Sequence, residues 1–153
     1  MAISPSGTLR ELTNFEQGVE IWKSRGYRVE LSPGFDDRWG YLAGDDANRL
    51  RQLADALNDP NCRGILCARG GFGSTRLLEK GKVGQGKNAQ FPMPDSHSPK
   101  WLIGFSDITA LLWNYAKLGI WGVHGPMLTT LAAEPDWSVD RLFISNKQSL
   151  AAL

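Results

Sequence analysis

The sequence predicts a single-domain α/β fold: a doubly wound, mostly parallel open sheet in three layers, of the flavodoxin-like kind. Three observations carry this prediction. Short apolar runs alternate about five times with helical segments along the 153 residues. One run, residues 64–68, is almost continuously apolar, as in a strand buried on both faces. The three most distinctive turns, residues 69–73, 104–107 and 124–126, each follow a predicted strand, and chemistry in such folds gathers at the carboxyl ends of strands.

The first half of the chain predicts two strands and two helices. Residues 3–5 are typical of the end of a strand, and Thr8–Glu11 have the pattern of a capping box that opens a helix. Residues 27–31 alternate as a strand does, and Asp45 or Asp46 is expected to cap a second helix. The expected buried faces are Leu12, Phe15, Val19 and Trp22 in the first helix, and Leu50, Leu53, Ala54 and Leu57 in the second.

The second half predicts three more strands, at residues 64–68, 101–103 and 121–124. Residues 80–98 lack any apolar period and are expected to form a flexible insertion. The remaining expected elements are a short helix from Ser74, a helix with its face at Ile108, Leu111, Leu112 and Tyr115, a last helix over 136–143, and a tail over 144–153. The predicted domain therefore spans residues 1–143.

Composition excludes several classes of protein. The net charge of +1 gives no field that would attract nucleic acid, and no stretch reaches the ~20 apolar residues of a membrane helix. The N-terminus has no secretory signal pattern. Two cysteines, Cys62 and Cys67, make neither a zinc set nor a disulfide framework, so we expect a reducing, cytoplasmic setting.

The turn Gly104–Asp107 is a candidate nucleophile site. A serine on a sharp strand-to-helix turn projects its hydroxyl clear of the sheet, and the next backbone amide can stabilise an oxyanion. Ser106 has this position, although Ile108 stands where the last glycine of a G-x-S-x-G elbow would be. The plainer alternative is that Ser106 or Asp107 only caps the following helix.

Two further turns complete the set of candidates. The glycines of Arg69–Gly73 let backbone amides approach an anionic ligand closely, and the guanidinium of Arg69 could bind a carboxylate through two N–H groups. The alternative is a plain glycine turn with Arg69 paired to a surface acid. His124 could act as a base for Ser106, but a lone histidine at a strand end is more often a hydrogen-bonded structural residue, and we favour that interpretation. The other histidine, His97, lies in the irregular insertion. The chain thus has a nucleophile but no convincing base.

Taken together, the motifs resemble the LD-carboxypeptidase family, or muramoyl-tetrapeptide carboxypeptidases, which includes the microcin C self-immunity peptidases. The resemblance covers roughly residues 3–143 apart from the insertion. It is carried in order by Ser4–Gly7, Tyr41–Gly44, Arg69–Ser74 with Arg76–Leu78, Gly104–Thr109 and His124–Met127.

The resemblance implies a serine peptidase that removes a terminal D-amino acid from murein tetrapeptides during cell-wall recycling, with no metal and no cofactor. By the family's motif Ser106 is the nucleophile, and the backbone amides of Asp107 and Gly71 are the oxyanion donors. Arg69, Gly70 and His124 are expected to contact the murein peptide substrate. The family's histidine and glutamate lie in a C-terminal domain with no counterpart here, so we expect a truncated chain that is inactive alone.

Two other functions stay open from the sequence. One is a non-catalytic α/β module that binds a small anionic or peptidyl ligand at the Arg69 loop; the other is a folding-deficient remnant. A homodimer is compatible with either. Binding without turnover, even after a His- and Glu-bearing domain is supplied, would favour the binding module.

Overall fold

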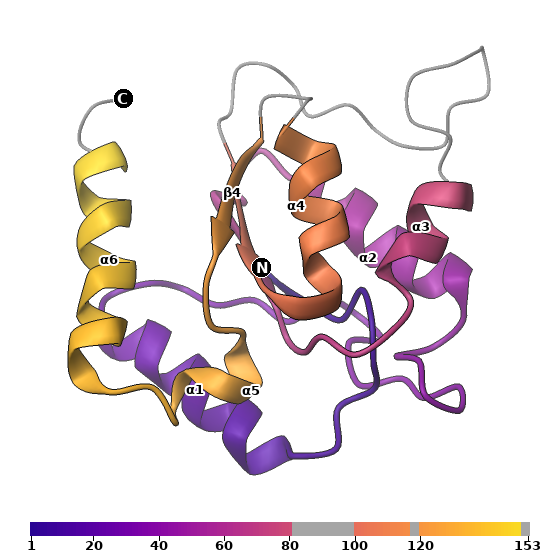
Figure 1. Ribbon diagram of the computed structural model, residues 1–153, viewed down its shortest axis with the longest axis horizontal. Helices are drawn as coiled ribbons and strands as arrows, with labels where there is room; N and C mark the ends of the chain where they lie inside the picture. Colours follow the sequence, from indigo (N-terminus) through magenta and orange to yellow (C-terminus); the bar gives the residue numbers. More distant parts are fainter. Residues whose placement is uncertain (81–99, 117–119, 151–153) are drawn as a thin grey trace.

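The computed structural model describes the backbone of residues 1–80, 100–116 and 120–150, with side chains described up to Phe143 and not at Lys80. Its centre is a four-stranded parallel sheet in the order β1-β2-β3-β4 (Figure 1). The strands are β1 (Ala2–Ile3), β2 (Gly64–Cys67), β3 (Trp101–Gly104) and β4 (Trp121–His124). The last three coincide closely with the apolar runs of the sequence.

The strand expected over residues 27–31 is only partly formed. Leu31 makes one isolated parallel bridge with Ala2, in which Ala2 donates to the Glu30 carbonyl and Ser32 donates to Ala2. The prediction of a regular strand is wrong because β1 has only two residues and offers this segment a single bridging partner. Even so, the segment lies on the far side of β1 from β2. After β1 the chain first forms this bridging segment on one side of β1, and it then crosses to the other side, where β2, β3 and β4 are added in order. This topology confirms the doubly wound, flavodoxin-like prediction.

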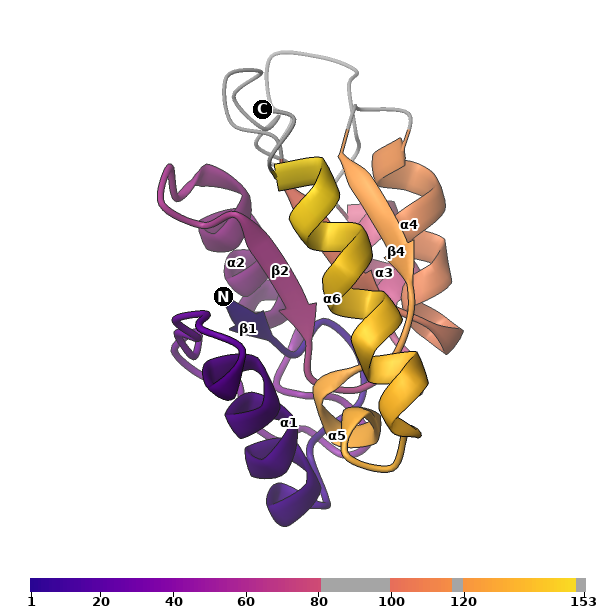
Figure 2. The same cartoon turned by 90° about the vertical axis from the view of Figure 1, so that its left-hand side faces the viewer.

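Helices cover both faces of the sheet (Figure 2). On one face lie α1 (Leu12–Ser24), α5 (Leu128–Leu131) and α6 (Asp136–Leu150), packed on Ala2, Leu66 and Ile103. On the other lie α2 (Asp46–Asn58), α3 (Ser74–Lys80) and α4 (Thr109–Ala116), packed on Ile3, Ile65 and Leu102. Neighbouring residues of each strand thus point to opposite layers, as the period of two requires.

The start of α1 differs from the prediction. The helix begins at Leu12 with Glu11 as its N-cap and no side-chain cap, so the capping box at Thr8–Glu11 is wrong. The Thr8 hydroxyl donates instead to the Asp37 carbonyl at 3.4 Å. Leu12 is 53% exposed, whereas Phe15, Gly18, Val19 and Trp22 are buried.

Gly18 explains how closely α1 approaches α5. A Cβ atom at this position would lie 2.0 Å from the carbonyl oxygen of Leu128, so only glycine allows the two backbones to touch. At the C-terminal end, α6 continues through Leu150, so the predicted boundary at residue 143 falls within this helix. The expected flexible insertion lies, from residue 81 to 98, outside the described residues.

Candidate functional site

The turn after β3 holds Ser106 in an unusual backbone conformation. Ser106 has φ of 61° and is the one residue other than glycine with positive φ in the described part of the chain. Such a left-handed conformation costs a serine free energy, and it is typical of functional turns. A short 3-10 helix (Ser106–Ile108) follows directly. A Cβ on Gly104 would lie 2.8 Å from Cγ2 of Ile108, so the glycine lets the turn close tightly.

Ser106 lines an open cavity of about 360 Å³ at the carboxyl edge of the sheet. The serine side chain is exposed and makes no hydrogen bond with any described residue. The cavity lies at the switch point, where the loops after β1 and β2 leave toward opposite faces, which is the usual ligand site of this architecture. Its lining residues are Glu11, Asn14, Arg69, Gly70, Gly71, Phe105, Ser106, Met127, Thr129 and Thr130.

The glycine-rich loop passes directly beside Ser106. A Cβ on Gly70 would lie 3.3 Å from Cβ of Ser106. Gly71 has φ of 113°, a backbone conformation that any other residue would adopt only with strain. The Gly70 carbonyl accepts a hydrogen bond from the Gly7 amide at 3.0 Å. Because the peptide is trans, the N–H of Gly71 points away from Gly7. The N–H groups of Gly71 and Asp107 have no acceptor among the described residues. Two unpaired amides beside an exposed hydroxyl can stabilise a developing oxyanion.

Arg69 is anchored to backbone. Its Nη1 donates to the Thr8 carbonyl at 3.1 Å, and no described carboxylate pairs with it, so the alternative of a surface ion pair is not observed. The guanidinium therefore ties the loop after β1 to the loop after β2 and keeps further N–H groups at the cavity wall.

His124 lies at the end of β4, in register with Gly104. Its side chain is exposed, its ring packs edge-on against Phe105 with centroids 6.3 Å apart, and it is not among the residues that line the cavity. In the part of the chain that the structure describes, no histidine bonds to Ser106. His97 lies outside that part.

The side chain of Asp107 has a role that the sequence did not reveal. Its carboxylate accepts hydrogen bonds from the Ser6 hydroxyl at 2.5 Å and from the Ser74 amide at 2.8 Å. The Ser74 amide belongs to the first residue of α3. The Asp107 carboxylate therefore lies at the N-terminus of this helix, where a phosphate or carboxylate ligand could otherwise bind. Both serines belong to motifs recognisable in the sequence, but nothing there links them to Asp107.

A buried arginine on α2, which the sequence analysis missed, holds the backbone of the same loops through hydrogen bonds. Arg49 on α2 is fully buried and donates to the carbonyls of Pro5 and Gly73 at 3.0 and 2.9 Å. It also pairs with Asp46, whose carboxylate binds Arg76 through two further bonds of 2.9 and 2.7 Å. Burial lowers the pKa of Arg49, and Asp46 opposes that shift. The place of Arg49 directly before the predicted apolar position Leu50 gave no sign of its burial.

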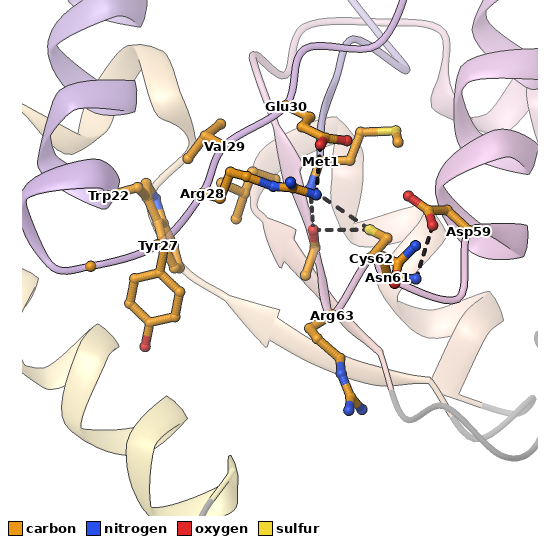
Figure 3. Close-up of a pocket in the computed structure, with 13 residues that line it drawn as sticks. Met1, Trp22, Tyr27, Arg28, Val29, Glu30, Asp59, Asn61, Cys62 and Arg63 are labelled. Carbon is orange, nitrogen blue, oxygen red and sulfur yellow. Dashed lines mark hydrogen bonds and ion pairs between the residues drawn. The ribbon is translucent and has the colours of Figure 1, made fainter.

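A second pocket, of about 270 Å³, lies at the opposite edge of the sheet (Figure 3). The ammonium group of Met1 donates there to the Gly64 carbonyl at 2.7 Å, and Arg28 pairs with Glu30 at 2.8 Å. The Cys62 thiol is already bonded to the Gly64 carbonyl. These groups satisfy one another, and the pocket is far along the strands from Ser106.

The described residues contain no group of three or more histidine, cysteine or acidic side chains placed to hold a metal ion. Within the same residues, no helix is long and apolar enough to span a membrane.

Known proteins are similar to this chain in both sequence and fold. A protein of Synechocystis sp., whose name assigns it to the carboxypeptidases, is 51% identical over 140 residues, which are 92% of this chain and 43% of that protein. The murein tetrapeptide carboxypeptidase of Pseudomonas aeruginosa is 36% identical over 110 residues, 72% of this chain and 33% of that one. A solved MccF-like protein from Bacillus anthracis superposes with a TM-score of 0.75 at 26% identity, covering 91% of this chain and 41% of the other. The chain thus spans less than half the length of these relatives.

Residues 1–125 match the family model of the LD-carboxypeptidase N-terminal domain. With the relatives above and the resemblance of the motifs, this shows that the chain belongs to the LD-carboxypeptidase family.

Proposed function

We propose that this chain supplies the nucleophile and both oxyanion donors of a serine-type carboxypeptidase that removes a terminal D-amino acid from murein peptides. The observation that carries the proposal is Ser106, held at positive φ on the turn after β3, exposed to a cavity and flanked by two unbonded amides. Relatives named as murein tetrapeptide carboxypeptidases supply the substrate class.

In the proposed reaction the Ser106 hydroxyl adds to the scissile carbonyl carbon. The carbonyl oxygen becomes an oxyanion that accepts hydrogen bonds from the amides of Asp107 and Gly71. The serine proton passes to a base and then to the leaving amine, which releases the D-amino acid. Water next hydrolyses the acyl–serine ester. Since His124 does not line the cavity, we assign the base to a domain outside this chain.

Arg69 and Gly70 are the proposed peptide contacts, because both line the cavity beside Ser106. We also propose a cytoplasmic location, supported by the two free, buried thiols of Cys62 and Cys67. The competing function is a module that binds a small anionic or peptidyl ligand at the Arg69 loop. It has one donor fewer for an anion, because the Asp107 carboxylate already accepts a hydrogen bond from the Ser74 amide.

The test is reconstruction of a complete enzyme. The part of the Synechocystis relative that follows the matched region is joined after Leu150, which leaves α6 intact. D-alanine release is measured from a tetrapeptide ending in D-alanine. We expect turnover in the fusion, little in the isolated chain, and loss by several orders of magnitude in Ser106→Ala.

His124→Ala in the fusion is the matched control and should retain activity. Unchanged turnover in Ser106→Ala would remove the serine-hydrolase proposal. Turnover by the isolated chain that disappears in His124→Ala would instead make His124 the base. Specific peptide binding with no turnover in the fusion would favour the binding module.

A further inference from the structure

The two unpaired amides beside Ser106 belong to different loops. The amide of Asp107 belongs to the elbow after β3, and that of Gly71 to the loop after β2. To stabilise one oxyanion, both N–H groups must lie within hydrogen-bond distance of the same point. Glycines at positive φ, Gly71 and Gly73, make the second loop intrinsically free to move. Some interaction must therefore fix one loop against the other.

Most hydrogen bonds of the glycine-rich loop join it to parts of the chain other than the elbow after β3. Gly70 accepts from Gly7, and Gly73 accepts from Arg49, so these bonds tie the loop to the segment after β1 and to α2. The hydrogen bonds that join it to the elbow involve Asp107 and Ser74. The Asp107 carboxylate accepts the Ser74 amide at 2.8 Å, and the Ser74 hydroxyl donates to the Asp107 carbonyl.

The same carboxylate also reaches the third loop. The Ser6 hydroxyl donates to it at 2.5 Å, and both Ser6 and Ser74 are fully buried. Hydrogen bonds to an ionised carboxylate are about twice as strong as neutral ones. Asp107 pairs with no cation at salt-bridge distance in the described part of the chain, so the carboxylate is held by these two donors.

We propose that the side chain of Asp107 is a positioning residue that fixes the Gly71 amide relative to the Asp107 amide, and thereby assembles both oxyanion donors around one point. The inference rests on the proposed function for the identity of the two donors. It assigns the side chain of Asp107 a role separate from that of its backbone.

The test uses the full chain and a small boronic acid, N-acetyl-1-aminoethylboronic acid in the L configuration. The trigonal boron accepts the Ser106 oxygen, a B–O bond forms, the hydroxyl proton goes to water, and a tetrahedral boronate anion remains. One boronate oxygen then takes the place of the oxyanion. The Kd is measured by titration, the tetrahedral state by ¹¹B NMR, and donor engagement by the ¹H shifts of the Asp107 and Gly71 amides.

We expect Asp107→Ala to weaken boronate affinity by roughly 10- to 100-fold, somewhat less than the 10²–10³-fold effect of deleting a donor. The Gly71 shift should be lost while the amide of residue 107 still responds. Asp107→Asn retains an oxygen for the Ser74 amide and should stay within about 3-fold of wild type, which separates the hydrogen bond from the charge. Asp36→Ala, an exposed acid on another loop, is the control for charge and handling.

Ser74→Pro gives a second, independent measurement if Asp107→Ala does not fold. Proline suits the first position of a helix, and it removes the N–H and the hydroxyl while its ring also restricts Gly73. It should therefore reproduce the loss, whereas Ser74→Ala, which keeps the N–H, should not. Wild-type affinity in a folded Asp107→Ala or Ser74→Pro variant would overturn the proposal, as would the absence of a tetrahedral boronate in wild type. A tetrahedral adduct that persists in Ser106→Ala would instead count against the proposed function itself.

Discussion

The positive φ of Ser106 makes a quantitative prediction about stability. A left-handed conformation costs a residue with a Cβ about 1–2 kcal/mol, and glycine does not incur this cost. Replacing serine by glycine also increases the entropy of the unfolded chain, which offsets about 0.5–1 kcal/mol. Alanine retains the strain. We therefore expect Ser106→Gly to be more stable than Ser106→Ala by about 1 kcal/mol, a net figure of these two effects.

The measurement is thermal and urea unfolding of the two variants side by side. For a chain of this length, 1 kcal/mol corresponds to a difference in Tm of about 2–4 °C. Both variants lack the hydroxyl, so its contribution cancels. The same pair at Ser24, an exposed residue at the end of α1, should show the opposite order, because alanine favours helix over glycine. If Ser106→Ala equals or exceeds Ser106→Gly in stability, the elbow is not strained and the geometry argued for the nucleophile is wrong.

Three other predictions concern the scaffold. Gly18→Ala should lower the free energy of unfolding by about 2 kcal/mol, because overpacking against the Leu128 carbonyl outweighs the helix preference of alanine. The control is Gly64→Ala, where a Cβ meets open space and the urea midpoint should stay nearly unchanged. Equal urea midpoints for the two variants would contradict this prediction. Arg49→Ala should cost about 3–5 kcal/mol, since it leaves two buried carbonyls without a donor and removes one of the two guanidinium groups that pair with Asp46. A urea midpoint near wild type would refute that role. Cys67 should resist a thiol reagent in the native chain and react only on unfolding, because burial raises the pKa of its thiol; rapid native labelling, followed by peptide mapping, would show that the strand opens.

The parts of the fold that the sequence predicts are those whose signal is local. The strands β2, β3 and β4 are short apolar runs bounded by turn residues, and the burial of β2 and β3 agrees with their almost continuous apolar sequence. Ser106 was identifiable because Gly104 and the change of period around it mark a sharp strand-to-helix turn. The predicted strand at 27–31 failed because alternation shows that a segment can pair, and not whether a partner of sufficient length lies beside it.

The contacts that organise the site could not be predicted, because they join distant residues. Ser6 and Asp107 are 101 positions apart, and no local pattern connects them. Arg49 escaped notice for another reason: arginine is rarely buried, so an apolar count places Leu50 and Ala54 on the inner face of α2. The structure turns that face toward Arg49 and Gln52, whose polar groups hold backbone of the surrounding loops.

The place of β1 in the sheet bears on how the chain folds during synthesis. β1 leaves the ribosome before β2, although β2 is its main partner, with Ala2 opposite Leu66. At about 5–20 residues per second, the ribosome needs roughly 3–13 s to make the intervening segment. During that interval the apolar Ala2 and Ile3, which end up fully buried, have no completed sheet to join. Slow translation between residues 2 and 66 should therefore lengthen the exposure of the nascent chain to chaperones, whereas slow translation after β4 should not.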